Sequence, residues 1–98
     1  MHVLIVEDER RIASFVARGL SREGYAVQAV ADGDGAMASV ARQEPALVLL
    51  DVMLPGRDGI AVLRELVAIK PALPVMMLSA RSDPETKVAA LRMARKEA

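Results

Sequence analysis

Two short apolar runs, each followed by a carboxylate, decide the fold of this chain: His2-Val3-Leu4-Ile5-Val6-Glu7-Asp8 and Ala46-Leu47-Val48-Leu49-Leu50-Asp51. A continuous apolar run of this length is typical of a strand that is buried on both faces, as in the middle of a parallel sheet. The sequence therefore predicts buried strands over residues 2–6 and 46–50.

Patterns of helical period alternate with the strands along the chain. The first helix is predicted over 9–23, where Ile12, Phe15, Val16, Gly19 and Leu20 form one apolar stripe, and Gly24 stands where a left-handed residue ends a helix. The order βαβαβαβα predicts a parallel sheet with helices on both faces. The remaining predictions are strands over 25–30 (nearer an edge) and 74–78, a turn over 32–35, and helices over 36–43, 60–69 and 86–98.

Length and composition narrow the possible classes of protein. The 98 residues suffice for a single domain, predicted over 1–98. Thirteen basic and thirteen acidic residues give no net charge, which argues against nucleic-acid binding by bulk electrostatics. The absence of cysteine and the single histidine exclude disulfides, thiolate sites and His-rich zinc sites. No apolar run approaches the roughly 20 residues that span a bilayer, so we expect a cytoplasmic protein without a membrane segment.

Polar side chains follow three of the predicted strands. Glu7 and Asp8 follow the first strand, Asp51 the third and Ser79 the fourth. Ligands of a parallel α/β sheet bind beyond the carboxyl ends of its strands, so these groups are expected at one rim. Neighbouring carboxylates repel unless a cation joins them, and Mg²⁺ prefers oxygen ligands. A carboxylate beside Mg²⁺ can attack phosphorus and become an aspartyl phosphate.

Each residue also has a purely structural explanation. Glu7 and Asp8 fit the N-terminus of a helix, where acidic side chains are favourable. Asp51 fits the end of a strand, and Ser79 alone is uninformative. Their joint placement after the correct strands favours a phosphoryl-transfer site over the separate structural explanations.

Three segments carry a resemblance to the receiver domain of bacterial two-component response regulators: residues 4–9, 49–59 and 77–81. The resemblance extends from Met1 to about Met93, and the wording of the motifs is most similar to that of regulators with a winged-helix DNA-binding domain. It implies a flavodoxin-like, three-layer α/β/α fold.

The resemblance also implies roles for individual residues. Asp51 would accept a phosphoryl group from the phosphohistidine of a sensor histidine kinase. Ser79 would be the switch hydroxyl that moves to the phosphoryl oxygen, and the small Ala80 would leave room beside the phosphate. The implied Mg²⁺ ligands are Glu7, Asp8, Asp51 and the backbone carbonyl of Met53.

The sequence departs from the family pattern near residue 98. The family's fifth strand, with its lysine and aromatic residue, and its fifth helix have no counterpart, so we expect a C-terminally truncated domain with sheet order 2-1-3-4. Strand 74–78 is then an apolar edge, and such edges pair with other chains. We expect a homodimer or swapped oligomer through strand 74–78 and the C-terminal helix.

Three functions remain open at this point. The first is a phosphoacceptor signalling domain, which modifies itself once per cycle and is not classed as an enzyme. The second is a truncated receiver that acts as a dimerising interaction module without productive phosphotransfer. The third, a Mg²⁺-dependent phosphatase, is the weakest, because Met53 stands two residues after Asp51 where an Asp-x-Asp signature needs a second aspartate.

Overall fold

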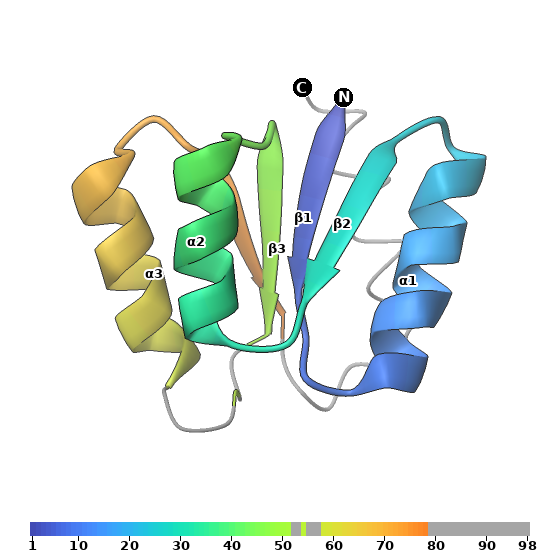
Figure 1. Cartoon of the computed structure of the whole chain (residues 1–98), viewed down its shortest axis with the longest axis horizontal. Coiled ribbons are helices and arrows are strands. Elements are labelled where there is room, and N and C mark those ends of the chain that lie inside the picture. The colour runs from blue at the N-terminus through green and yellow to red at the C-terminus, as the bar shows by residue number, and fades with distance from the viewer. Residues whose placement is uncertain (52–53, 55–57, 79–98) are drawn as a thin grey trace.

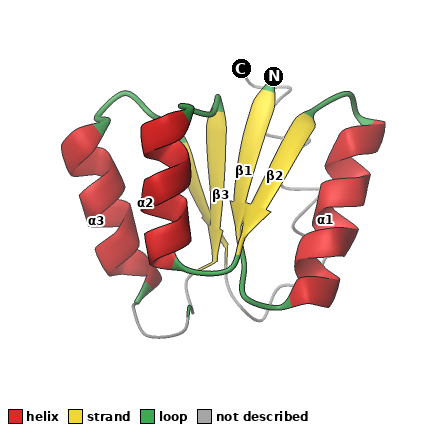
Figure 2. Cartoon of the chain, viewed as in Figure 1, coloured by secondary structure: helices red, strands yellow, loops and turns green. Residues whose placement is uncertain are grey.

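The computed structural model describes residues 1–51, 54 and 58–78 of the chain. Four parallel strands form one sheet between two layers of helix (Figures 1 and 2). The strands are β1 (His2–Val6), β2 (Ala26–Val30), β3 (Leu47–Asp51) and β4 (Val75–Leu78). The helices are α1 (Arg10–Arg22), α2 (Gly33–Arg42) and α3 (Gly59–Ile69). The sheet order is β2-β1-β3-β4, as predicted.

The two central strands, β1 and β3, lie side by side in a register that positions the functional residues. Val6 is the partner of Leu50, so the residues that follow them, Glu7 and Asp51, come out at the same edge of the sheet. Residues 3–6 of β1 are buried on both faces, which explains why the run is apolar without interruption.

Alternate residues of β1 supply two separate cores, because successive side chains of a strand point to opposite faces. Leu4 and Val6 pack with α2 and α3, whereas Val3 and Ile5 pack with α1. Figure 1 shows α2 and α3 on one face of the sheet and α1 on the other. The larger core consists of Leu4, Val6, Ala36, Val40, Val48, Leu50, Val62, Leu66 and Leu73, and the smaller of Val3, Ile5, Val16, Leu20 and Leu49.

Helix α1 ends where the sequence predicts, but its buried face differs from the predicted stripe. Gly24 has a φ of 92°, the left-handed conformation expected after a helix. Val16 and Leu20 are buried together with Ala13, whereas Phe15 is 42% exposed. The inclusion of Phe15 in the buried stripe is therefore wrong.

Helix α2 begins at Gly33, so the prediction of a turn over 32–35 is wrong. The carboxylate of Asp32 accepts a hydrogen bond of 2.7 Å from the backbone N–H of Gly35. This side-chain cap satisfies a backbone donor that the first helical turn leaves unpaired, and it allows the helix to start within a glycine-rich segment. On α2 the apolar residue Ala41 is exposed, whereas the polar Ser39 is buried.

The edge position predicted for the second strand is confirmed, because among the described residues β2 pairs only with β1. Its Gln28 accepts a hydrogen bond of 3.0 Å from the hydroxyl of Ser39 on α2, which pairs two polar side chains between strand and helix. The helix predicted over 86–98 lies outside the described residues. Among the described helices, none has the length and apolar character needed to cross a membrane.

Candidate functional site

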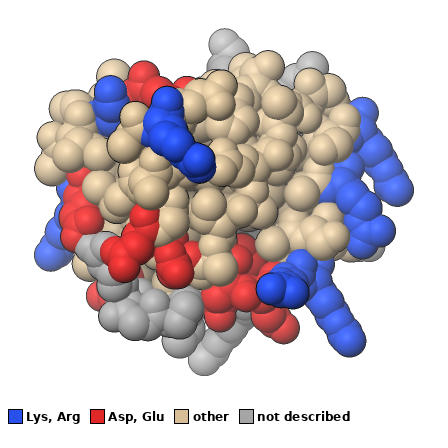
Figure 3. Space-filling model, viewed as in Figure 1, with Lys and Arg blue, Asp and Glu red and all other residues tan. Residues whose placement is uncertain are grey.

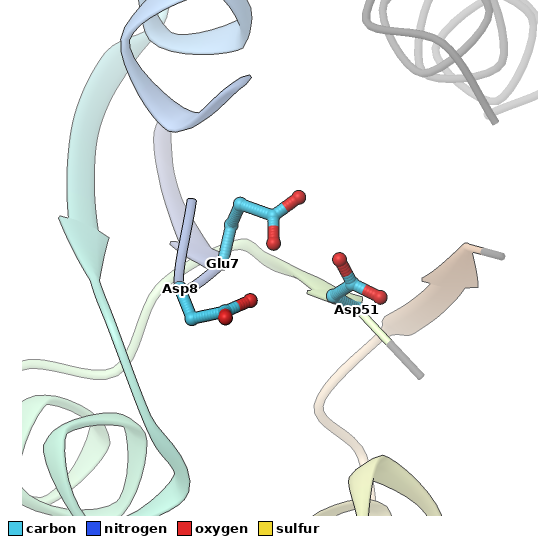
Figure 4. Close-up of side chains that lie close together, drawn as sticks. All are labelled: Glu7, Asp8 and Asp51. Carbon is cyan, nitrogen blue, oxygen red and sulfur yellow. The ribbon is translucent and has the colours of Figure 1, made fainter. Parts of the chain in front are cut away.

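Three carboxylates meet beyond the carboxyl ends of β1 and β3. Glu7 continues β1 by one residue, and its backbone N–H donates a 3.0 Å hydrogen bond to the carbonyl of Val30 on β2. Asp8 begins the connection to α1, and Asp51 is the last residue of β3 rather than the first after it. Figure 4 shows the three side chains turned toward one common space.

The three carboxylates lie close enough to share one ion. One oxygen of each of Glu7, Asp8 and Asp51 lies within 4.8 Å of the others. Glu7 and Asp51 are only 5% and 6% exposed, whereas Asp8 is exposed. The cluster is therefore held by the sheet on one side and opens to solvent at Asp8.

A pocket next to the cluster is lined mostly by apolar side chains. It is small and partly open to solvent, with a volume of about 10 Å³, which is roughly the room that one water molecule needs. Helix α1 forms one wall through Ile12 and Val16, and Leu49 is part of the lining on the sheet. Apolar walls lower the local dielectric and so strengthen the interactions of the charges at the mouth.

Helix capping does not explain the two acidic residues that follow β1. The N-cap of α1 is Glu9, and its side chain makes no capping hydrogen bond. Glu7 lies in line with the strand, and Asp8 precedes the cap position. Their placement beside Asp51 therefore needs an explanation other than capping.

The donor set fits a hard divalent cation. Among the described residues the donors are carboxylate oxygens, which suit Mg²⁺ better than they suit the nitrogen- and sulfur-preferring metals. Carboxylates this close repel one another, and a bound cation offsets that repulsion. The exposed side at Asp8 leaves room for the water molecules that Mg²⁺ retains.

The structure describes only some of the other residues to which the sequence draws attention. Met53, Ser79 and Ala80 lie outside the described residues. Asp58, which precedes the helix predicted over 60–69, is the N-cap of α3 and accepts a 2.7 Å hydrogen bond from the backbone N–H of Ile60. Asp followed by Gly directly before an apolar helical pattern was the signal available for this cap.

The fold is that of a flavodoxin-like α/β domain, and a cluster of three carboxylates with the geometry to hold a cation lies at its strand ends. A family model of the response regulator receiver domain matches residues 3–97, and the chain belongs to this family.

Solved structures of response regulators are similar to the chain. NtrX from Brucella abortus, in complex with ADP, is 41% identical over 93% of this chain and 21% of its own length, with a TM-score of 0.78. The receiver domain of NtrX from Brucella abortus is 28% identical over 98% of this chain and 99% of its own, with a TM-score of 0.83. The BeF3-activated N-terminal receiver domain of RstA from Klebsiella pneumoniae is 31% identical over 96% and 80%, with a TM-score of 0.76. This chain thus spans about a fifth of the length of the first of these proteins.

Proposed function

We propose that this chain is a phosphoacceptor that takes a phosphoryl group on Asp51 from the phosphohistidine of a sensor histidine kinase. The observation that carries the proposal is the convergence of Glu7, Asp8 and Asp51 within 4.8 Å, at the strand ends of a receiver domain. The proposed acceptor is the buried Asp51. It ends β3, whereas Glu7 and Asp8 follow β1, and it lies opposite both of them (Figure 4).

The proposed transfer is a substitution at phosphorus. A carboxylate oxygen of Asp51 forms a bond to phosphorus while the bond from phosphorus to the histidine nitrogen breaks. The electron pair of that bond stays on the imidazole, and the product is an aspartyl phosphate. A bound Mg²⁺ supplies positive charge to the phosphoryl oxygens, where negative charge is greatest during transfer.

The residues of this chain divide the work of binding and orientation. Glu7, held by its backbone bond to β2, fixes one side of the ion site, and the exposed Asp8 binds where water can enter. Family membership adds three residues to the proposal: the carbonyl of Met53 as a further ligand, the hydroxyl of Ser79 as the switch, and Ala80 as the small neighbour of the phosphate.

The wider setting of the proposal follows from the family. Residues 1–98 act as one receiver domain in the cytoplasm, with a histidine kinase as partner. The wording of the motifs, which is most similar to that of winged-helix regulators, supports the proposal that the full regulator has an output domain of that type. The chain modifies itself and turns over no separate substrate beyond slow self-phosphorylation and self-dephosphorylation.

Intact mass spectrometry after incubation with acetyl phosphate tests the proposal. We expect one phosphoryl adduct per chain that requires Mg²⁺ and disappears in Asp51→Asn. A matched control is Glu44→Gln, which removes an exposed carboxylate before β3, at the opposite end of that strand. Glu44→Gln is expected to form the adduct normally. No adduct on the unsubstituted chain at saturating Mg²⁺ would contradict the proposal.

A second function is favoured by one observation on β4. This apolar strand has a single neighbour, β3, in the described part of the chain. A chain that pairs through this edge would act as a dimerising interaction module, with or without phosphotransfer.

A further inference from the structure

Helix α1 concentrates positive charge next to the acidic cluster. Its thirteen residues include four arginines and no acidic residue, although the whole chain has no net charge. Two of the four, Arg10 and Arg11, lie in its first turn and are exposed. Figure 3 shows Lys and Arg side chains directly beside Asp and Glu side chains at the lower edge of the molecule, on the side where Figure 1 places α1.

The helix itself gives no reason for arginines at this end. The N-terminus of a helix carries partial positive charge, which disfavours cationic side chains there and favours them at the C-terminus. Arg22, in the last turn, is in the favourable place, whereas Arg10 and Arg11 are not. Their position therefore points to something outside the helix.

The two arginines are tied to the mouth of the site by the chain. Arg10 and Arg11 follow Asp8 by two and three residues, so their Cα atoms lie within about 7.6 and about 11.4 Å of that of Asp8. The next residue, Ile12, lines the pocket beside Glu7 and Asp51. The first turn of α1 is thus part of the rim that a ligand for Asp51 passes.

Without Arg10 and Arg11, the rim would carry a net negative charge that repels an anionic phosphoryl donor. Glu9, the N-cap residue of α1, directly follows Asp8 and adds a fourth negative charge next to the cluster, so that one bound Mg²⁺ would leave a local charge of −2. A phosphoryl donor such as acetyl phosphate is itself an anion and is repelled. Two exposed guanidinium groups at the rim offset that charge. Their Cα atoms lie at most about 7.6 and about 11.4 Å from that of Asp8, which is comparable with the Debye length of about 8 Å at physiological salt, so salt screens the interaction only in part.

We propose that Arg10 and Arg11 attract the phosphoryl group of the donor to the mouth of the site and so raise the second-order rate of Asp51 phosphorylation. The inference rests on the proposed function. The arginines are positioning residues, because they act on the approach of the donor. In the step itself, an Asp51 oxygen bonds to phosphorus, the bond from phosphorus to the acetyl oxygen breaks, and acetate leaves with the electron pair.

A matched pair of double variants tests this role. Arg10→Gln with Arg11→Gln removes the two charges at the rim, and Arg18→Gln with Arg22→Gln removes the same charge from α1 about 10 Å or more farther along the helix. At low salt, the first variant is expected to react with acetyl phosphate about 3- to 10-fold more slowly than the unsubstituted chain. At 0.5 M salt, which screens the charges, the variant is expected to be slower by less than about 2-fold. The second variant is expected to react at the unsubstituted rate.

The Mg²⁺ affinity of the Arg10→Gln, Arg11→Gln variant, measured by titration without any phosphodonor, is expected to change in the opposite direction to the rate. Removing two positive charges from the rim tightens Mg²⁺ binding by about 2- to 5-fold at low salt, since cations repel. A loss of structure in the first turn would weaken both Mg²⁺ binding and phosphorylation. Arg10→Lys with Arg11→Lys keeps the charge and is expected to keep the unsubstituted rate.

The outcomes separate the inference from the function on which it rests. No adduct on the unsubstituted chain overturns both. An adduct that forms equally fast in the Arg10→Gln, Arg11→Gln variant overturns the inference alone. Equal slowing in the Arg18→Gln, Arg22→Gln variant, or slowing that persists at 0.5 M salt, also overturns the inference, because it assigns the effect to the helix as a whole.

Discussion

At the scale of single residues, the three carboxylates differ in what surrounds them. Glu7 and Asp51 are buried at the ends of neighbouring strands, and Asp8 is exposed in the connection to α1. A buried carboxylate pair needs a compensating charge more than an exposed residue does, because burial removes water from the charged form. Replacing Asp8 should therefore disturb the fold least, so Asp8 is the best position at which to test whether a carboxylate contributes to ion binding.

We predict that Asp8→Asn lowers Mg²⁺ affinity by about tenfold or more, because it removes one charged ligand of a hard cation. The stability of the metal-free chain is expected to stay equal or to rise, because the substitution relieves repulsion from Glu7 and Asp51. Calorimetric titration with Mg²⁺ and a thermal melt in EDTA measure the two effects. Glu44→Gln, away from the site, should leave both unchanged. Unaltered Mg²⁺ affinity in Asp8→Asn would remove Asp8 from the ion site.

The convergence of these residues was predictable from the sequence, because parallel strands end at one rim of a sheet. The pairing of Val6 with Leu50, which brings Glu7 level with Asp51, was not predictable. That register depends on how two apolar strands pack between two helix layers. A continuous apolar run is compatible with several registers, because it has no alternation of polar and apolar residues to select one.

At the scale of elements, the first residue of a helix depends on side-chain capping hydrogen bonds, which residue periodicity and composition do not reveal. The Asp-Gly-Asp-Gly segment over 32–35 has the composition of a turn, yet the structure begins α2 within it. The Asp32 side chain decides the outcome by capping the Gly35 N–H, and α3 begins in the same way at Asp58. The strand bounds, by contrast, were predictable to within one residue because apolar runs mark them directly.

We predict that Asp32→Ala lowers the free energy of unfolding by about 1 kcal/mol, the usual effect of losing an N-cap. Asp32→Ser keeps an acceptor at the cap and should retain most of the stability. Urea denaturation followed by circular dichroism measures both variants. If Asp32→Ala unfolds at the same urea concentration as the unsubstituted chain, the cap does not stabilise α2.

Helix α1 shows why an apolar stripe is wider than the face that it buries. Successive residues turn by about 100°, so Phe15 and Ala13 lie on opposite flanks of Val16. The structure packs the Ala13 flank against the sheet and leaves Phe15 exposed. A period alone cannot choose between two flanks, because that choice depends on the position of the sheet.

At the scale of the whole molecule, the four described strands form a sheet with two edges of different character. Edge strand β2 carries Gln28, which is paired with Ser39, whereas β4 is apolar throughout. The carbonyl of Pro74 accepts a hydrogen bond from the N–H of Val48, which is also the register partner of Val75. In a parallel ladder this arrangement turns the backbone N–H of Val75 away from β3, toward the outer edge.

We predict that the chain forms a dimer or larger assembly at tens of micromolar through β4 and the helix predicted from the sequence over 86–98, either by edge pairing or by exchange of these segments. Sedimentation velocity measures the assembly. Val75→Pro removes an outward N–H without removing a hydrogen bond to β3, and is expected to shift the chain toward monomer while leaving its circular dichroism unchanged. A monomer for the unsubstituted chain across this concentration range would contradict the prediction.

The central claim of the account is that Asp51 is the residue that carries the phosphoryl group. Borohydride reduces an aspartyl phosphate to homoserine, and peptide mass spectrometry then gives its position in the chain. After reaction with acetyl phosphate and Mg²⁺, we predict homoserine at position 51 and at no other aspartate. Homoserine at Asp8 or Asp58, or reduction at no position despite saturating donor and Mg²⁺, would contradict the claim.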